Sequence, residues 1–241
     1  MNKREPHSLL KSLLALLLIA GCIWAAQWQF HRGVARHDRN TQINSHIDLP
    51  VLPLASVVSS PEKNEWRRVS VTGRFDSTKQ ILLRNHYSEG KYGFEVLTAF
   101  NSHSGEEFWV DRGWVKAGAL ATERPELPAT PLNEVTIVGR VRLDTSLPQG
   151  NFFAIPTGKT SGLISEANAQ SSNESRGIKS DFYLDLLSGD LPELTPAVPA
   201  EIPELTDGPH FAYTLQWVIF AGLVVYGRFL IRREVLTREE L

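Results

Sequence analysis

The stretch Leu13-Leu-Ala-Leu-Leu-Leu-Ile-Ala-Gly-Cys-Ile-Trp-Ala-Ala26 decides the fold class, because these fourteen residues include no charged or strongly polar side chain. Apolar residues on both sides extend the run to about 22 positions, which at ~1.5 Å per residue is long enough to span a bilayer core of roughly 30 Å. Lys11 lies near one end of the run, and Trp28 lies near the other, where an aromatic belt at the membrane surface is expected. Residues 13–30 are therefore predicted to form a transmembrane helix.

A second apolar run, from Phe211 to Ile231, lies near the other end of the chain. Aromatic residues stand at its beginning and arginines at its end, which is typical of a segment whose ends meet lipid headgroups. Residues 210–231 are therefore predicted to form a second transmembrane helix. Because basic residues tend to remain inside the cell, those on the terminal sides of the two helices place both chain termini in the cytoplasm. These residues are Lys3, Arg4, Lys11, Arg228, Arg232, Arg233 and Arg238.

The organisation of the rest of the chain follows from these two spans. Residues 1–12 are predicted to form a cytoplasmic N-terminus, residues 31–209 an extracytoplasmic domain, and residues 232–241 a cytoplasmic C-terminus. Within the domain, residues 158–179 are rich in Gly, Ser and Asn and are predicted to form a mobile loop. Residues 191–209 contain five prolines and are predicted to lead, in an extended conformation, into the second helix.

The sequence Ile19-Ala-Gly-Cys22 supports an alternative, because it follows a basic N-terminal region and a Leu-rich run as a bacterial lipoprotein cleavage box does. The chain would then be anchored by a lipid on Cys22. After such a cysteine the mature chain normally becomes polar, whereas Ile23 to Ala26 continue the apolar run. Cys22 is therefore predicted to be an apolar helix residue, with the lipoprotein as the alternative.

Alternating apolar and polar residues dominate the middle domain. Val69-Ser-Val-Thr-Gly-Arg-Phe75 has the period of two that is typical of a β-strand, and further stretches repeat it. They cover residues 80–83, 94–100, 108–110, 135–143 and 182–187. The predicted fold class is a membrane protein in which two transmembrane α-helices flank a mainly antiparallel β (α+β) extracytoplasmic domain. Gly73 and Gly113 are expected to be sensitive positions if they adopt a positive φ angle.

Composition and motifs exclude several classes of function. The chain has 25 Lys and Arg against 27 Asp and Glu, a net charge of −2, so no basic field favours nucleic acid as a partner. Cys22 is the only cysteine, which excludes an intramolecular disulfide, thioredoxin-like chemistry and covalent c-type haem. The seven histidines lack metal-ligand spacing, and Gly158-Lys-Thr160 lacks the first glycine of a phosphate loop. Nothing in the sequence supports an enzyme.

The strongest local signal lies at the outer ends of the two spans, in Gln27-Trp-Gln-Phe-His-Arg32 and His210-Phe-Ala-Tyr-Thr-Leu-Gln-Trp217. Both segments carry Gln, Trp and His at the same depth. A neutral imidazole at a membrane surface can bind haem iron, and a neighbouring Gln or Arg can pair with haem propionates. An interfacial histidine that only caps or hydrates a helix end has the same pattern, so both interpretations remain open.

A second dense signal is Glu107-Phe-Trp-Val-Asp-Arg-Gly-Trp-Val115, an aromatic-rich strand that ends at Asp111, Arg112 and Gly113. Arg112 could bind a propionate, or the carboxylate of a partner, through two parallel hydrogen bonds. A structural Asp/Arg pair at a turn that needs glycine is the alternative.

The order and spacing of several motifs cover nearly the whole chain. They are Trp28-Gln29 with Arg32, Val71-Thr-Gly-Arg-Phe75, Arg84-Asn85, Gly93-Phe-Glu-Val-Leu-Thr98, Val110-Asp-Arg-Gly-Trp-Val115, Val138-Gly-Arg140, and His210 with Tyr213-Thr-Leu-Gln-Trp217. Together they resemble the bacterial form of the surfeit locus protein one family of cytochrome c oxidase assembly factors. The departures are mild, and one of them is Asp111, where the family commonly has Asn.

The resemblance implies a non-enzymatic assembly factor for haem-copper cytochrome c oxidase, which receives haem a from haem a synthase and presents it to the catalytic subunit of the oxidase. A multi-pass protein of the bacterial cell inner membrane, with its main domain in the periplasm, fits this role. His210 becomes the leading ligand of the haem iron, and His31 a second candidate. The other residues expected at the haem are Trp28, Arg32, Arg112, Tyr213, Gln216 and Trp217.

Two alternatives to haem delivery remain. The first is a membrane scaffold without a cofactor, which stabilises an oxidase assembly intermediate. The second is a lipoprotein adapter anchored at Cys22.

The predicted orientation can be tested with reporter fusions. A reporter fused after Leu241 should be active only if it works in the cytoplasm, and a reporter inserted between Gly158 and Lys179 only if it works outside, because the terminal basic clusters hold both chain ends inside. The measurement is reporter activity in whole cells. The opposite pattern of activities would contradict the orientation.

Overall fold

The computed structural model describes residues 6–118, 125–148, 154–158, 178 and 180–237. The chain divides into two compact units. One comprises Ile43–Pro203, and the other comprises Met1–Gln42 together with Glu204–Leu241. Most of the predicted mobile loop at residues 158–179 lies outside the described residues, except that Gly158 ends a strand and Ile178 is buried.

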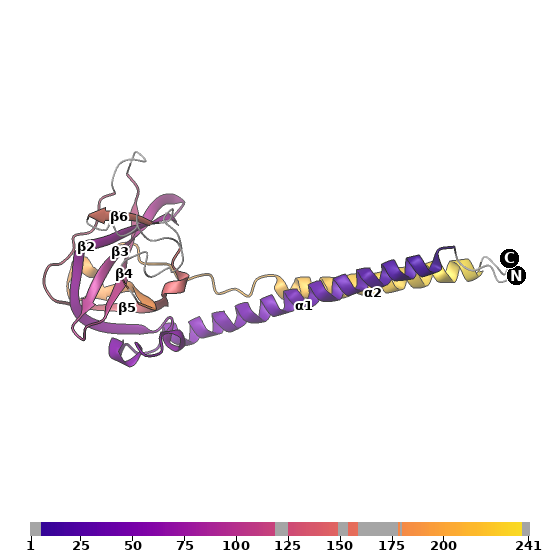
Figure 1. Ribbon diagram of the computed structural model, residues 1–241, viewed down its shortest axis with the longest axis horizontal. Helices are drawn as coiled ribbons and strands as arrows, with labels where there is room; N and C mark the ends of the chain where they lie inside the picture. Colours follow the sequence, from indigo (N-terminus) through magenta and orange to yellow (C-terminus); the bar gives the residue numbers. More distant parts are fainter. Residues whose placement is uncertain (1–5, 119–124, 149–153, 159–177, 179, 238–241) are drawn as a thin grey trace. The chain divides into compact units, whose positions relative to one another are not determined.

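The helical unit contains helix α1 (Ser8–Ile47) as far as Gln42 and helix α2 (His210–Thr237), which lie side by side (Figure 1). Both are long and apolar enough to cross a membrane, with mean hydropathies of 2.2 and 1.6 over their most apolar segments. The first helix continues past the apolar run as far as Ile47, where Pro50 follows shortly after and prevents regular continuation. Its polar second part therefore extends beyond the length that a bilayer core accommodates.

Polar contacts join α1 and α2 at two levels. Near one end, Arg228 donates hydrogen bonds to Ser12 Oγ at 3.1 and 3.2 Å and to Ser8 Oγ at 3.2 Å. Near the other end, His210 contacts Gln29. Ser12 and Gln29 are 17 residues apart on α1, a rise of about 25 Å, so the two contacts lie at the depths of the two surfaces of a bilayer core.

The second unit is built around a seven-stranded sheet among the described residues. Its strands are β1 (Leu52–Pro53), β2 (Arg68–Ser88), β3 (Lys91–Ser102), β4 (Glu107–Lys116), β5 (Val135–Leu143), β6 (Ala154–Gly158) and β7 (Phe182–Gly189). Short 3-10 helices cover Leu54–Ser56, Pro61–Asn64, Asp144–Ser146 and Pro192–Leu194. The strand order β2-β3-β4-β7-β5 returns to β2, which closes the sheet into a barrel. Only the β1–β2 and β4–β7 pairs are parallel, so the predicted fold class is confirmed.

The length of β2 makes the closure possible. The sequence predicts two separate strands at residues 69–75 and 80–83, whereas the structure has one strand with a register shift between Asp76 and Gln80. At this shift Asp76 Oδ1 accepts hydrogen bonds from the backbone N–H and the hydroxyl of Thr78, at 2.9 and 2.6 Å. A bulge of this kind bends a strand. Residues 68–73 of β2 therefore pair with β5 and residues 79–83 with β6, while β3 pairs with β2 on both sides of the shift.

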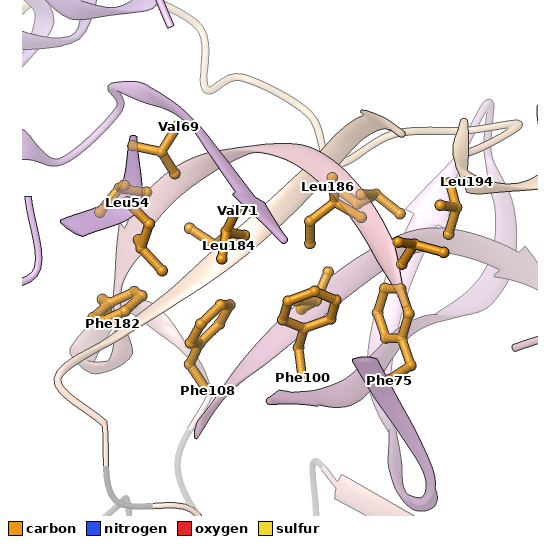
Figure 2. Packing of buried hydrophobic residues seen from close by; sticks show 14 of the residues in the cluster. Leu54, Val69, Val71, Phe75, Phe100, Phe108, Phe182, Leu184, Leu186 and Leu194 are labelled. Atoms are coloured by element: carbon orange, nitrogen blue, oxygen red, sulfur yellow. The ribbon is translucent and has the colours of Figure 1, made fainter. Parts of the chain in front are cut away.

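A row of phenylalanine rings forms the main core of the barrel (Figure 2). Neighbouring ring centroids are 5.1 Å apart for Phe182 and Phe108, 5.6 Å for Phe108 and Phe100, and 4.9 Å for Phe100 and Phe75. The rings come from β7, β4, β3 and β2, and each tilted or edge-on pair contributes about 0.5–1.5 kcal/mol beyond the burial of its area. The aromatic row therefore ties together four of the five barrel strands.

The two glycines that the sequence indicates are restricted for different reasons. Gly113 has a φ of +90°, as predicted, a conformation in which a side chain is strained. Gly73 does not have a positive φ, so that reason is wrong for this position. Instead, a Cβ at Gly73 would collide with the backbone oxygen of Asn101 and lie 2.7 Å from the ring of Phe100.

Charged residues are buried on the sides of β4 and β7 that face away from the row of phenylalanine rings. Asp111 and Asp185 lie next to each other in register, with 2% and 1% of their surface exposed. Asp185 Oδ2 accepts long hydrogen bonds of 3.4 Å from Arg140 and from Arg142. The guanidinium of Arg142 also lies 3.8 Å from the ring centroid of Trp66. This cluster neutralises charges that burial would otherwise make costly.

The surroundings of Asp111 favour the neutral form of its carboxyl. Burial, reinforced by the charges of Glu95 and Asp185, raises the pKa of Asp111 well above its usual range. Its Oδ1 accepts a hydrogen bond of 2.9 Å from the backbone N–H of Gly113. The carboxyl is also hydrogen-bonded to Glu95. In its neutral form it offers one acceptor and one donor, as an Asn side chain would.

Replacing Asp111 tests this neutral state. Asp111→Asn should change the free energy of unfolding by less than about 0.5 kcal/mol at pH 7, since the amide keeps both hydrogen bonds. Asp111→Ala should cost about 1–3 kcal/mol, because Gly113 N–H would be left unpaired in the interior. Chemical denaturation of the full chain in detergent measures both variants. Equal destabilisation by Asn and Ala would show that Asp111 is charged.

Asp185 should make stability depend on pH in the opposite sense to an ordinary paired carboxylate. Burial raises the pKa of Asp185 to about 6, although Arg142 and Arg140 act to lower it, from an ordinary value of 3.8. Between these two pKa values the folded chain therefore binds more protons than the unfolded chain. This contribution to the free energy of unfolding is fully present below pH 4 and is lost as the pH rises through 6. Asp185→Asn removes this titration. The free energy of unfolding of the variant should rise relative to the unmodified chain by on the order of 1–3 kcal/mol between pH 4 and pH 7.

Denaturation at a series of pH values gives the difference between the two proteins. Asp185→Asn also loses the ion pairs to Arg140 and Arg142. This loss changes the free energy of unfolding of the variant by the same amount at every pH, so it does not change how the difference between the two proteins depends on pH. A difference that does not vary between pH 4 and pH 7 would contradict the raised pKa of Asp185.

Candidate functional site

His210 is the first residue of α2 and follows Pro209. The backbone N–H of Tyr213 donates to Pro209 O at 3.0 Å, so regular helix hydrogen bonding begins at once. The hydroxyl of Thr214 donates to His210 O at 3.0 Å and lies 3.5 Å from Ala26 O on α1. These contacts hold the imidazole of His210, which is half-buried, at the outer end of the helix pair.

Gln29 of α1 orients the imidazole of His210. The Nδ1–H of His210 donates to Oε1 of Gln29 at 2.9 Å. A hydrogen bond at one ring nitrogen fixes the tautomer and leaves the other nitrogen as a free acceptor. In the neutral imidazole with this tautomer, Nε2 carries the lone pair. Metal-binding histidines usually donate their other ring N–H to an oxygen acceptor, a role that Oε1 of Gln29 can fill.

Phe211 packs closely against α1 beside this histidine. Its ring lies edge-on to Phe30, with centroids 6.0 Å apart. A Cβ at Gly33 would lie 3.0 Å from the ring of Phe211, so the missing side chain at Gly33 makes room for the ring. This packing keeps the first turn of α2 at the level of Gln29.

An apolar groove of about 530 Å³ begins beside Gln29. Its volume falls within the range of roughly 300–1,000 Å³ that is usual for small-molecule sites. Trp28 and Trp217 contribute aromatic walls, and Gln29 is the one amide in the lining. We call this feature the α1 groove; its residues are Leu17, Leu18, Gly21, Cys22, Trp24, Ala25, Trp28, Gln29 and Trp217.

The structure brings Trp217 and Arg32 to the side of the helices that carries the His210–Gln29 contact. Trp217 follows His210 by seven residues, almost two full turns, and lines the groove. Arg32 follows Gln29 by three residues, which places it on the neighbouring part of the same face. Its guanidinium lies 5.1 Å from the ring centroid of Trp28. A cation therefore stands above the groove at the membrane surface.

His31, Tyr213 and Gln216 lie differently. His31 is exposed and is about 200° around α1 from Gln29, so it does not point toward His210, although it follows the groove residue Trp28 by three residues. Tyr213 is exposed on α2 one turn from His210, and Gln216 is about 240° around the helix from His210. The structure therefore places only Tyr213 of these three near the imidazole.

Arg112 belongs to the β unit and is bound within it. Its Nη1 donates to Pro128 O at 3.2 Å and to Thr130 Oγ1 at 2.8 Å, and its Nη2 donates to Ala129 O at 2.5 Å. Burial lowers the pKa of Arg112 to about 10, so the side chain remains a cation at neutral pH. Arg112 thus holds the segment 128–130 against β4, and this contact uses its terminal donors.

Gln29 is the partner of His210 that the sequence did not single out. It stands in the quoted segment Gln27-Trp-Gln-Phe-His-Arg32, yet nothing in that segment distinguishes it from Gln27. The distinguishing signal is the helix face, since Gln29 lies one turn from Ala26, the buried residue of α1 in that region. Among the described residues, no cluster of three or more His, Cys, Asp or Glu side chains offers another metal site.

Comparison with known proteins agrees with this architecture. The profile of the SURF1 family matches residues 16–222. Similar proteins include uncharacterized SURF1-like proteins of Mycobacterium bovis and of two strains of Mycobacterium tuberculosis. Each is 30% identical over 219 residues, which are 84% of this chain and 74% of the relative. The predicted resemblance is confirmed, and the chain belongs to the SURF1 family of oxidase assembly factors.

Proposed function

We propose that this chain binds haem a at the outer end of its helix pair and presents it to the catalytic subunit of cytochrome c oxidase. The observation that carries the proposal is the hydrogen bond of 2.9 Å between His210 and Gln29. In a neutral imidazole this bond leaves Nε2 available to bind iron, and its partner Gln29 lines an apolar groove with tryptophan walls.

The chemistry suits a cargo that must be released. His210 is the histidine that contacts Gln29, whereas His31 points about 200° away from Gln29 and His37, two turns further along α1, contacts Asp207 at 2.9 Å. One axial ligand binds iron less firmly than two and leaves the other axial position open. The apolar groove accommodates the hydrophobic part of the cargo, and Arg32 stands where an acidic propionate would reach the membrane surface.

The proposed topology has both termini in the cytoplasm and residues 43–203 in the periplasm of a bacterial inner membrane. The two apolar helices support membrane insertion. The basic residues at the terminal ends of both helices support the orientation. Haem a synthase would supply the haem from the same bilayer, and the oxidase catalytic subunit would receive it.

The lipoprotein alternative conflicts with the contacts of α1. Lipoprotein processing would remove every residue before Cys22, including Ser8 and Ser12. Both serines accept hydrogen bonds from Arg228. Removing them would leave an arginine within α2 without these partners, at a cost that membrane helices usually avoid. We therefore favour an intact first helix, in which Cys22 lines the groove.

Substitution of His210 tests haem binding directly. His210→Ala removes the proposed iron ligand but little apolar surface, so the variant should reach the membrane in normal amount and retain little haem when isolated from cells that make haem a. Gln29→Leu should lower haem affinity about tenfold, because the imidazole loses the partner that fixes its tautomer. The measurement is the absorption spectrum of each purified protein together with oxidase activity in the membranes.

His31→Ala is the matched control, since it removes an imidazole at the same depth on the other face of α1. This variant should retain its haem. If the unmodified protein carries no haem, or if His210→Ala keeps all of it, the delivery mechanism is wrong and the scaffold without a cofactor takes its place.

A further inference from the structure

The α1 groove extends well below the imidazole. Its residues repeat along one face of α1, from Gln29 beside His210 to Leu17 deep in the apolar part of the helix. These two residues are 12 positions apart, a distance of about 18 Å along the helix axis. Below Gln29 the lining includes no charged side chain, and Cys22 supplies its one thiol.

The floor of the α1 groove is formed by small residues. Gly21, Cys22 and Ala25 lie on one face of α1, between the larger side chains of Trp24 and Trp28. A Cβ at Gly21 would meet no described atom within 4 Å. Trp217 of α2 stands beside this floor, seven residues below His210. The groove is therefore long and lined by apolar atoms, a form that suits a flexible hydrocarbon chain.

We propose that the α1 groove holds the isoprenoid tail of the haem whose iron binds His210, and that it makes the protein select haems with such a tail. This inference rests on the proposed role of His210. Continuity supports it, because Gln29 both orients the imidazole and lines the upper end of the groove. A tail that leaves a ring bound at His210 would enter the groove at Trp28 and run toward Leu17.

The covalent bond between the tail and the bound haem ring explains why the tail, rather than a lipid, occupies the groove. Acyl chains of the bilayer can also lie on an apolar helix face. A tail that is covalently joined to the bound ring has a high effective concentration at the groove, so it displaces free chains. The tail does not leave water when it enters the groove, and the gain therefore comes from packing contacts alone. We expect a moderate preference of roughly tenfold for that reason.

The test compares haem o with haem b, since haem o differs from haem b only by an isoprenoid tail in place of a vinyl group. The purified full chain is titrated with each haem, and the absorption change gives the two dissociation constants. The unmodified protein should bind haem o roughly tenfold more tightly than haem b. Gly21→Leu should fill the groove and reduce this ratio to about twofold or less, with the haem b affinity unchanged.

Gly222→Leu is the matched control. Gly222 lies in α2, lines no part of the groove, and has no described atom within 4 Å of the position of a Cβ. This variant should keep the full preference for haem o. Ala25→Phe blocks the groove one turn above Gly21 and provides a second variant if Gly21→Leu does not insert into the membrane.

The outcomes separate this inference from the proposed function. Equal affinity for haem o and haem b, with both lost in His210→Ala, would overturn the tail site and leave haem delivery intact; lipid chains would then occupy the groove. Loss of the preference in Gly222→Leu as well as in Gly21→Leu would also overturn it. Failure of the unmodified protein to bind either haem would overturn the proposed function itself. Weaker self-association of Gly21→Leu without any change in haem preference would assign the groove to a second copy of the chain and overturn the tail site.

Discussion

The hydrogen bond between Gln29 and His210 joins residues that are 181 positions apart in the chain, and the proposed haem site depends on it. Polar side chains near the ends of apolar helices are stabilised by partners on a neighbouring helix. Gln29 and His210 are such partners at one end of the helix pair, and Arg228 with Ser8 and Ser12 at the other. These contacts fix the register of α1 against α2. The same register brings His210 to Gln29, which lines the upper end of the α1 groove.

The two sides of the barrel strands lie in different surroundings, one apolar and one charged. Phe108 on β4 packs into the row of phenylalanine rings, while Asp111, three residues later on the same strand, lies among buried charges. Burial raises the pKa of Asp111, which favours its neutral form, and two arginines approach one oxygen of Asp185. Several of the motif residues that identify the SURF1 family therefore maintain the barrel. The family signature in the β unit and the proposed chemistry at the helix ends are separate features of the chain.

The candidate site could be predicted from the sequence only in part. His210, Trp217, Trp28 and Arg32 were expected at the haem, and the structure places them around one end of the helix pair. Arg112 was expected there because a guanidinium suits a propionate, but its donors bind the carbonyl groups of residues 128 and 129 and the hydroxyl of Thr130. Sequence alone cannot show that a buried arginine already has acceptors, because these acceptors are backbone atoms of a segment without a recognisable motif.

The sequence by itself determined the two apolar helices, the strand character of the middle segment and the family, since each of these depends on local composition, periodicity or motif order. Only the tertiary structure decided which strands pair with one another and which faces of the two helices are in contact. The return of β5 to β2, the parallel pairing of β4 with β7 and the choice of Gln29 rather than Gln27 as the partner of His210 all depend on contacts between distant segments. A hydrophobic period identifies the face of a strand or helix that is buried, but it contains no information about the element that buries it.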